Sequence, residues 1–188
     1  MKTLTLEDVV RVIGSIQPSG TEEKSLPLIN GRRVKNKTYY IAGDSTKLAN
    51  NGGEALLPST VKTTGVTNFP SGGQLSKGVY FMCTGVRILF DIVVLTDPTL
   101  ATWASTAPVA WKNGELIIGQ DGQPSLFEAP GTDVTNFKAS TGNDDDFREI
   151  SGFLIQPQKQ ISIKALTAGA PVASTYKIEL RGYEFVQA

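Results

Sequence analysis

The chain has 188 residues, with 18 Lys and Arg against 18 Asp and Glu, one cysteine and no histidine. This length suits one domain with a substantial core, and a single cysteine excludes an internal disulfide. Histidine is the usual general base and zinc ligand. Because the chain has none, catalytic triads and metal sites that depend on histidine are excluded. We therefore predict a protein that is not an enzyme and holds no cofactor.

The neutral total hides an uneven distribution of charge. Residues 1–94 carry 11 basic and 7 acidic side chains, a net +4, whereas residues 95–188 carry 7 and 11, a net −4. Basic residues concentrate between 24 and 47, and acidic residues between 115 and 149. Opposite poles on a neutral chain favour self-association over sequence-specific nucleic-acid binding, which calls for a net basic surface. The alternative is that the fold intersperses these charges.

The chain begins with a helical pattern. Apolar residues recur at helical spacing up to Ile13. Thr5 is a candidate N-cap, and Gly14 is expected to end the helix. We predict a short amphipathic helix over 5–13 within an N-terminal arm of residues 1–17. Its apolar stripe would dock on its own domain, on a neighbouring subunit or on a lipid surface.

Residues 18–188 are predicted to form a single β-sandwich domain. This part of the chain contains short runs that are apolar or alternate between apolar and polar residues, separated by turn dipeptides. We expect Asn113-Gly114 to form the type I′ turn of a hairpin and a β-bulge at Arg181-Gly182 to reverse the alternation of the last strand. The strand over 86–95 is apolar on both faces, so it is predicted to be central in its sheet. The expected strands are 38–42, 78–83, 86–95, a hairpin over 109–118, 125–128, 150–156, 161–165 and 176–186.

About eight strands with little helix predict an all-β fold, an antiparallel sandwich or barrel. The long connections rich in glycine, serine and threonine, such as 50–64 and 129–146, favour a jelly roll. They suit an immunoglobulin sandwich less well, because its Cys…Trp…Cys signature is also missing.

Three groups of residues are candidates for chemistry or binding. The acidic run at 143–146 lacks the spaced pattern of a calcium loop, so it is read as a solvated loop or a contact for a basic neighbour. Asp91 and Glu179 are the acids inside confident strands, where they face solvent or pair with neighbouring arginines rather than act as a hydrolase pair. The aromatic side chains that would form a platform for sugar rings are Trp103, Trp111, Tyr39 and Tyr40.

Two stretches carry a resemblance to a known group of proteins. They are Tyr176-Lys-Ile-Glu-Leu-Arg-Gly-Tyr-Glu184 and Asn143-Asp-Asp-Asp-Phe-Arg-Glu149, within a β-rich chain that has a short helical arm. Over residues 60–188 the architecture resembles the jelly-roll capsid proteins of tailless icosahedral bacteriophages. The resemblance implies a subunit of a virion, assembled from copies of itself as trimers, pentamers or pseudo-hexamers, together with other virion proteins.

Within that resemblance, the charge asymmetry predicts the subunit interface. We expect the basic segment of one copy to face the acidic segment of the next and to set its orientation. The alternative is a carbohydrate- or receptor-binding β-sandwich module, for example of a phage fibre. The expected interface residues are Arg32, Arg33, Lys35, Lys37, Asp144, Asp145 and Asp146.

Overall fold

A computed structural model gives the structure of the protein for a defined part of the chain. The predicted N-terminal arm, with its helix over 5–13, lies outside the described residues, and so do Asp144, Asp145 and Asp146. The structure describes residues 28–29, 32–45, 54–55, 62–70, 73–91, 93, 95, 97–103, 107–131, 147–169 and 173–187.

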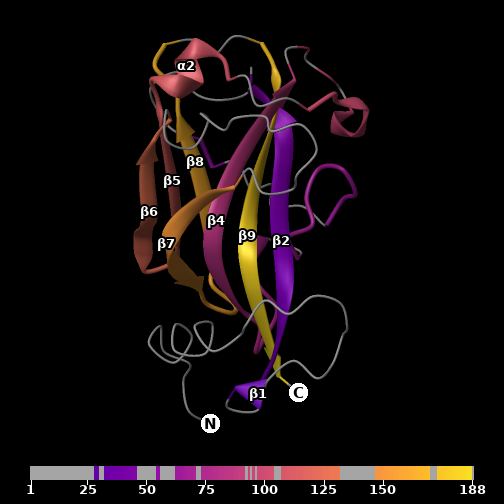
Figure 1. Ribbon diagram of the computed structural model, residues 1–188, viewed down its shortest axis with the longest axis vertical. Helices are drawn as coiled ribbons and strands as arrows, with labels where there is room; N and C mark the ends of the chain where they lie inside the picture. The colour runs from indigo at the N-terminus through magenta and orange to yellow at the C-terminus, as the bar shows by residue number, and fades with distance from the viewer. Residues whose placement is uncertain are drawn as a thin grey trace.

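The described strands form two antiparallel sheets (Figure 1). In sheet 1 the order is β1 (Leu28–Ile29), β2 (Arg32–Asp44), β9 (Thr175–Gln187), β4 (Tyr80–Asp91) and β7 (Arg148–Ile155). In sheet 2 the order is β3 (Glu54–Ala55), β8 (Ile161–Leu166), β5 (Glu115–Gln120) and β6 (Gln123–Pro130). Helix within the described residues amounts to short turns such as η3 (Pro98–Leu100) and α2 (Val109–Lys112). The predicted all-β, two-sheet architecture is confirmed.

The strands pair in a nested order along the chain. β2 pairs with β9, β3 with β8, β4 with β7, and β5 with its successor β6. Two further pairings, β4 with β9 and β5 with β8, join these nested pairs into the two sheets. Each pair is antiparallel, so the chain behaves as one long hairpin that has been wrapped into two layers.

The core fills the space between the sheets. Most of its fully buried side chains come from the inward faces of both sheets, because alternate residues of a strand point to opposite faces, and Phe69 and Leu75 are added by the connection between β3 and β4. Burying each large apolar side chain stabilises the fold by roughly 1.5–3 kcal/mol. The largest fully buried members are Phe69, Phe81, Phe90, Ile41, Leu75, Ile88, Leu116, Ile118, Ile155, Ile161 and Ile163.

The register of sheet 1 is irregular at Thr84 of β4. Against β9 the pairing shifts between Cys83 and Gly85, so the two strands predicted over 78–83 and 86–95 are one bulged strand with Thr84 as the extra residue; against β7, residues 150–152 of β7 lie opposite Thr84. The bulge predicted at Arg181-Gly182 is wrong, because β9 pairs with β2 in unbroken register over 13 residues. Gly182 is instead needed for close packing, since a Cβ there would overlap the carbonyl oxygen of Met82.

Both faces of sheet 1 carry buried apolar residues near the end that holds β1. A second cluster, separate from the main core, lies on the face that points away from sheet 2, because its residues alternate with Tyr39 and Leu180 of the core. This explains why Phe185 is apolar without any change of phase in β9. The buried members are Val34, Met82 and Phe185, with Tyr80, Leu154 and Tyr183 packed against them.

The hairpin predicted over 109–118 is also wrong. Residues 109–112 form α2, and Asn113 has a φ of −93°, which is incompatible with a type I′ turn. Trp111 packs in the core at 5.0 Å from the ring of Phe90, and this burial fixes the helical turn. The hairpin of this region joins β5 to β6 through Asp121 and Gly122, where the glycine has a φ of +80°.

The edge of β2 is closed by a short segment beside it. The Asn68 side chain accepts a hydrogen bond from Tyr40 N at 2.7 Å and donates one to Thr38 O at 2.7 Å. Ala42 N donates to Val66 O at 2.7 Å. An exposed strand edge is a template for unwanted pairing, and these contacts block it over the second half of β2.

Candidate functional site

The predicted basic segment lies on β2, at the edge of sheet 1. Arg32 pairs in register with Gln187 of β9. Arg33, Lys35 and Lys37 alternate along the strand, so they share the face that carries Tyr39. Arg33 and Lys35 are exposed, and Lys37 Nζ lies 5.2 Å from the centre of the Tyr39 ring.

Part of this basic segment is engaged within the same chain. Glu184 of β9 is buried, and Lys35 Nζ lies 3.0 Å from its Oε1, while the Tyr39 hydroxyl donates to its Oε2 at 2.8 Å. Burial raises the pKa of the Tyr39 hydroxyl far above its ordinary value, and the negative charge of Glu184 adds to this shift. Tyr39 is therefore a neutral donor to a buried carboxylate at neutral pH.

The acidic segment does not form one continuous patch in its described part. Glu115 is exposed at the start of β5, whereas Asp121 lies in the β5–β6 turn and accepts a hydrogen bond from Gln160 N at 3.0 Å. Glu128 on β6 and Glu149 on β7 are exposed. β6 and β7 lie on the left in Figure 1, with β2 on the right, so Glu128 and Glu149 do not lie beside the basic residues of β2 in the same copy.

The two strand carboxylates, Asp91 and Glu179, do not form a catalytic pair in this arrangement. The expectation for Asp91 is wrong, because it is buried and accepts backbone hydrogen bonds from Val93 at 3.0 Å and Thr102 at 2.7 Å; it orders the connection after β4. The expected arginine partner of Glu179 is confirmed, because its carboxylate accepts a hydrogen bond from Arg87 Nε at 2.9 Å. Lys177 Nζ also lies 2.6 Å from this carboxylate. Both carboxylates are thus occupied by contacts within the chain.

The outer face of sheet 1 carries a row of cations against aromatic rings. The guanidinium groups of Arg87 and Arg181 lie 4.4 Å and 4.6 Å from the centre of the Phe147 ring. Lys177 Nζ lies 4.9 Å from the Tyr40 ring and 5.8 Å from the Trp103 ring. These distances are within the range of cation–π attraction.

Only part of the predicted aromatic platform is on the surface. Tyr39 and Trp111 are buried in the core and are unable to display their ring faces, which corrects that part of the expectation. Trp103 and Tyr40 are half-buried, and both rings lie close to the same cation, Lys177.

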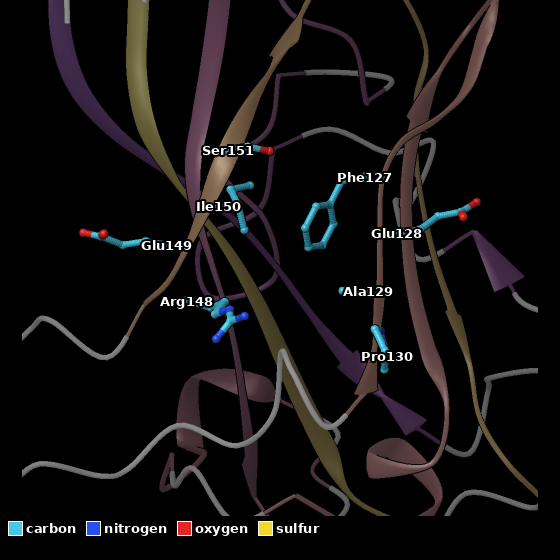
Figure 2. A pocket seen from close by; sticks show the side chains of 8 residues that line it. All are labelled: Phe127, Glu128, Ala129, Pro130, Arg148, Glu149, Ile150 and Ser151. Atoms are coloured by element: carbon cyan, nitrogen blue, oxygen red, sulfur yellow. The ribbon is translucent and has the colours of Figure 1, made fainter. Parts of the chain in front are cut away.

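The sequence did not indicate the pocket between β6 and β7 (Figure 2). It has a volume of about 270 Å³. The Phe127 ring and the Ile150 side chain point into it, whereas Glu128 and Glu149 point away, and Arg148 and Pro130 mark one end. β6 and β7 are the outer strands on the same side of the two sheets, so the pocket lies where the sandwich is open. The sequence feature that could have indicated it is Phe127 between Pro124 and Pro130, because prolines within a strand mark it as an edge strand.

The connection between β4 and β5 carries three exposed large apolar side chains. Leu100, at the end of η3, is 73% exposed, Val109 is 70% exposed and Val93 is 52% exposed. η3 is capped at its N-terminus, where the Asp97 carboxylate accepts hydrogen bonds from Thr99 N at 2.9 Å and Thr99 Oγ1 at 2.7 Å. The same hydrogen bonds lower the pKa of Asp97, so this exposed carboxylate is ionised at neutral pH.

The described residues offer few reactive groups. They include no group of three or more side chains suited to holding a metal ion, and none of their helices has the length and hydrophobicity needed to cross a membrane. Cys83 is buried, which raises the pKa of its thiol and makes it a poor nucleophile. The Ser45 hydroxyl is also buried, 2.9 Å from that of Ser174.

The chain was compared with protein families, curated proteins and solved structures. No family, no curated protein and no solved structure matches it.

Proposed function

We propose that the chain is a structural protein of a virus particle, a jelly-roll capsid subunit that assembles with copies of itself into an icosahedral shell. The nested pairing of β2–β9, β3–β8, β4–β7 and β5–β6 carries the proposal, since this order is what a long hairpin gives when it is rolled into two sheets. Jelly rolls of this kind serve as viral capsid, lectin and cupin domains. A cupin metal centre is disfavoured because the chain contains no histidine.

In this proposal the subunits associate head to tail. The basic residues Arg32, Arg33, Lys35 and Lys37 lie on β2, on one side of the sandwich, and the described acidic residues Glu128 and Glu149 lie on β6 and β7, on the other side. Opposite charges on opposite sides let one copy orient the next, and each contact stays weak enough for misplaced subunits to leave. Asp144, Asp145 and Asp146 are the proposed acceptors of these basic residues.

Electron microscopy and light scattering of the purified full chain test the proposal. We expect closed particles or oligomers of fixed size at low salt, and we expect Arg32→Glu with Arg33→Glu to weaken their formation. The matched control is Lys159→Glu with Lys164→Glu, which reverses two exposed charges away from β2. A monomer at every salt concentration contradicts the capsid proposal, and unchanged assembly of the β2 variant contradicts the charge-guided interface alone.

The second candidate is a carbohydrate-binding module, and one observation favours it. The Trp103 and Tyr40 rings both lie within 6 Å of Lys177 Nζ on the outer face of sheet 1, at 5.8 Å and 4.9 Å, and aromatic faces beside a cation suit sugars, acidic ones in particular. This function predicts that a glycan quenches the fluorescence of Trp103 and that Trp103→Ala abolishes binding on a glycan array. No glycan response in a protein that forms particles decides for the capsid subunit.

A further inference from the structure

The second apolar cluster of sheet 1 (the outer cluster) is buried on a face that points away from sheet 2. Its members Val34, Met82 and Phe185 are only 1%, 2% and 0% exposed. Neighbouring side chains of one sheet shield each other from the side, but they leave their outer ends open to solvent. Burial this complete therefore calls for a further layer over this face, because an apolar sheet face is stabilised by packing against another element.

The outer cluster is a regular array that crosses four strands of sheet 1. The register of β2, β9, β4 and β7 places its six side chains in two neighbouring rows. Within the described residues, the apolar side chains packed against the three buried members all come from these rows. The described part of the sheet thus supplies the floor of an apolar contact. One row consists of Val34, Phe185 and Tyr80, and the other of Tyr183, Met82 and Leu154.

The N-terminal arm contains a segment that matches this floor in chemistry and size. The nine residues of the helix expected over 5–13 are about 13.5 Å long, and four adjacent strands are about 14 Å across. Charged side chains such as Glu7 and Arg11 fall on one face of this helix. Four apolar side chains follow the i, i+3, i+4, i+7 spacing that places them together on the other face, and these are Leu6, Val9, Val10 and Ile13.

The chain enters sheet 1 beside the outer cluster. Leu28 of β1 pairs with Arg33, which is the neighbour of Val34 in β2. Residues 14–27 connect the expected helix to this point, and they span up to roughly 46 Å when extended at about 3.3 Å per residue. The helix therefore reaches the cluster of its own copy. A short tether also gives an effective concentration on the order of millimolar, which favours this cluster over that of a second copy.

We propose that residues 5–13 dock as a helix on the outer cluster of their own copy, with the apolar face of the helix against Met82 and Phe185. The end of the sandwich near β1 then has three layers, in the order arm, sheet 1 and sheet 2. Docking covers an apolar face that would otherwise promote association between copies. The proposal holds for a single chain, so it does not depend on the proposed self-assembly.

Thiol alkylation of cysteine variants of the full chain tests the docking. Val10→Cys places a thiol on the apolar face of the expected helix, and Arg11→Cys, the matched control, places one on the charged face. A docked thiol reacts only through the undocked fraction of molecules, so Val10→Cys should react at least about tenfold more slowly than Arg11→Cys. Equal rates overturn the proposal. Cys83 is buried, so its labelling reports any unfolding of the chain.

A charge placed in the outer cluster tests where the helix docks. Adding Leu154→Glu to the Val10→Cys protein should raise its alkylation rate toward that of Arg11→Cys. The matched control is Leu89→Glu, which changes another half-buried leucine on the same face of sheet 1, opposite Lys177 and outside the cluster. This control should leave the thiol protected. Protection that survives Leu154→Glu overturns the proposed docking place.

A substitution in the arm gives the same test without changing sheet 1, and it decides the outcome if labelling of Cys83 shows that Leu154→Glu unfolds the chain. Ile13→Asp removes part of the apolar face and should expose the Val10→Cys thiol. Arg11→Asp introduces the same side chain on the charged face and should leave the thiol protected. Equal effects of the two substitutions contradict docking through the apolar face.

A mixture of two chains distinguishes docking within one copy from exchange between copies. The first chain carries Val10→Cys with Leu154→Glu, and the second carries Ile13→Asp, so its own cluster is open. At micromolar concentration the thiol should stay reactive when the second chain is added in excess. Protection by the second chain overturns docking within one copy, because it shows that arms are exchanged. Protection of Val10→Cys that requires vesicles of phosphatidylcholine and phosphatidylglycerol also overturns it, in favour of a membrane contact.

Discussion

The buried carboxylate of Glu184 has two partners that contribute very different free energies to stability, and this gives a quantitative prediction. We consider Tyr39→Phe and Lys35→Met, each of which removes one partner. The Tyr39 hydroxyl is buried and donates at 2.8 Å to a charged acceptor, an interaction that contributes about 1.5–3 kcal/mol. The Lys35 side chain is 51% exposed, so its pair at 3.0 Å contributes about 0–1 kcal/mol after screening by solvent.

Thermal and urea denaturation of the two variants test this difference in the free energy of unfolding. For a chain of this length each kcal/mol shifts the melting temperature by about 2–4 °C, so Tyr39→Phe should lower it by about 3–12 °C and Lys35→Met by no more than about 4 °C. The midpoint in urea should fall accordingly, with an unchanged slope. An equal or larger loss from Lys35→Met would refute the reasoning that burial decides the strength of these contacts.

The pH dependence of stability supplies a second readout for the same residue. The pKa of Tyr39 is raised in the native state, so the unfolded chain releases this proton first, near its ordinary pKa of about 10. The corresponding stability is complete below that pH and is lost as the pH rises further, because the unfolded state then binds fewer protons than the native state. The difference in unfolding free energy between the native protein and Tyr39→Phe should therefore shrink above about pH 10.

Two further substitutions test the packing of sheet 1. Gly182→Ala should destabilise the fold by about 1–3 kcal/mol or more, because its Cβ would overlap the backbone of Met82, whereas Gly85→Ala, whose Cβ would meet its nearest atom at 3.2 Å, should cost less in the same denaturation assay. Asn68→Ala should cost about 2 kcal/mol through two lost hydrogen bonds and should speed exchange of the Tyr40 amide, measured by NMR; undiminished protection of that amide would contradict the edge-closing role.

The sequence predicted the fold class well because strand alternation is a local signal. The alternating runs at 161–165 and 176–186 became β8 and β9, and Val86, Ile88 and Phe90 point into the core as expected. The bulge was misplaced because the reading of β9 assumed that only one face of the strand is buried. Burial of Phe185 on the opposite face removes the need for a phase change.

Other features depend on contacts that no local pattern encodes. Asn113-Gly114 has the composition of a type I′ turn, but the burial of Trp111 imposes a helical turn before it. The contact between Tyr39 and Glu184 joins residues 145 positions apart, and sequence alone gave no reason to pair them. The pocket arises only when β6 and β7 come to the same side of the two sheets.

The central position of β9 in sheet 1 also constrains how the protein is made. β2 lies on one side of β9 and β4 on the other, and both precede it in the chain. At a translation rate of about 5–20 residues per second, β2 leaves the ribosome on the order of ten seconds before its partner exists. During that interval β2 and β4 lack β9, the strand that lies between them in sheet 1. The nascent chain must therefore be kept apart from neighbouring chains until β9 has been synthesised.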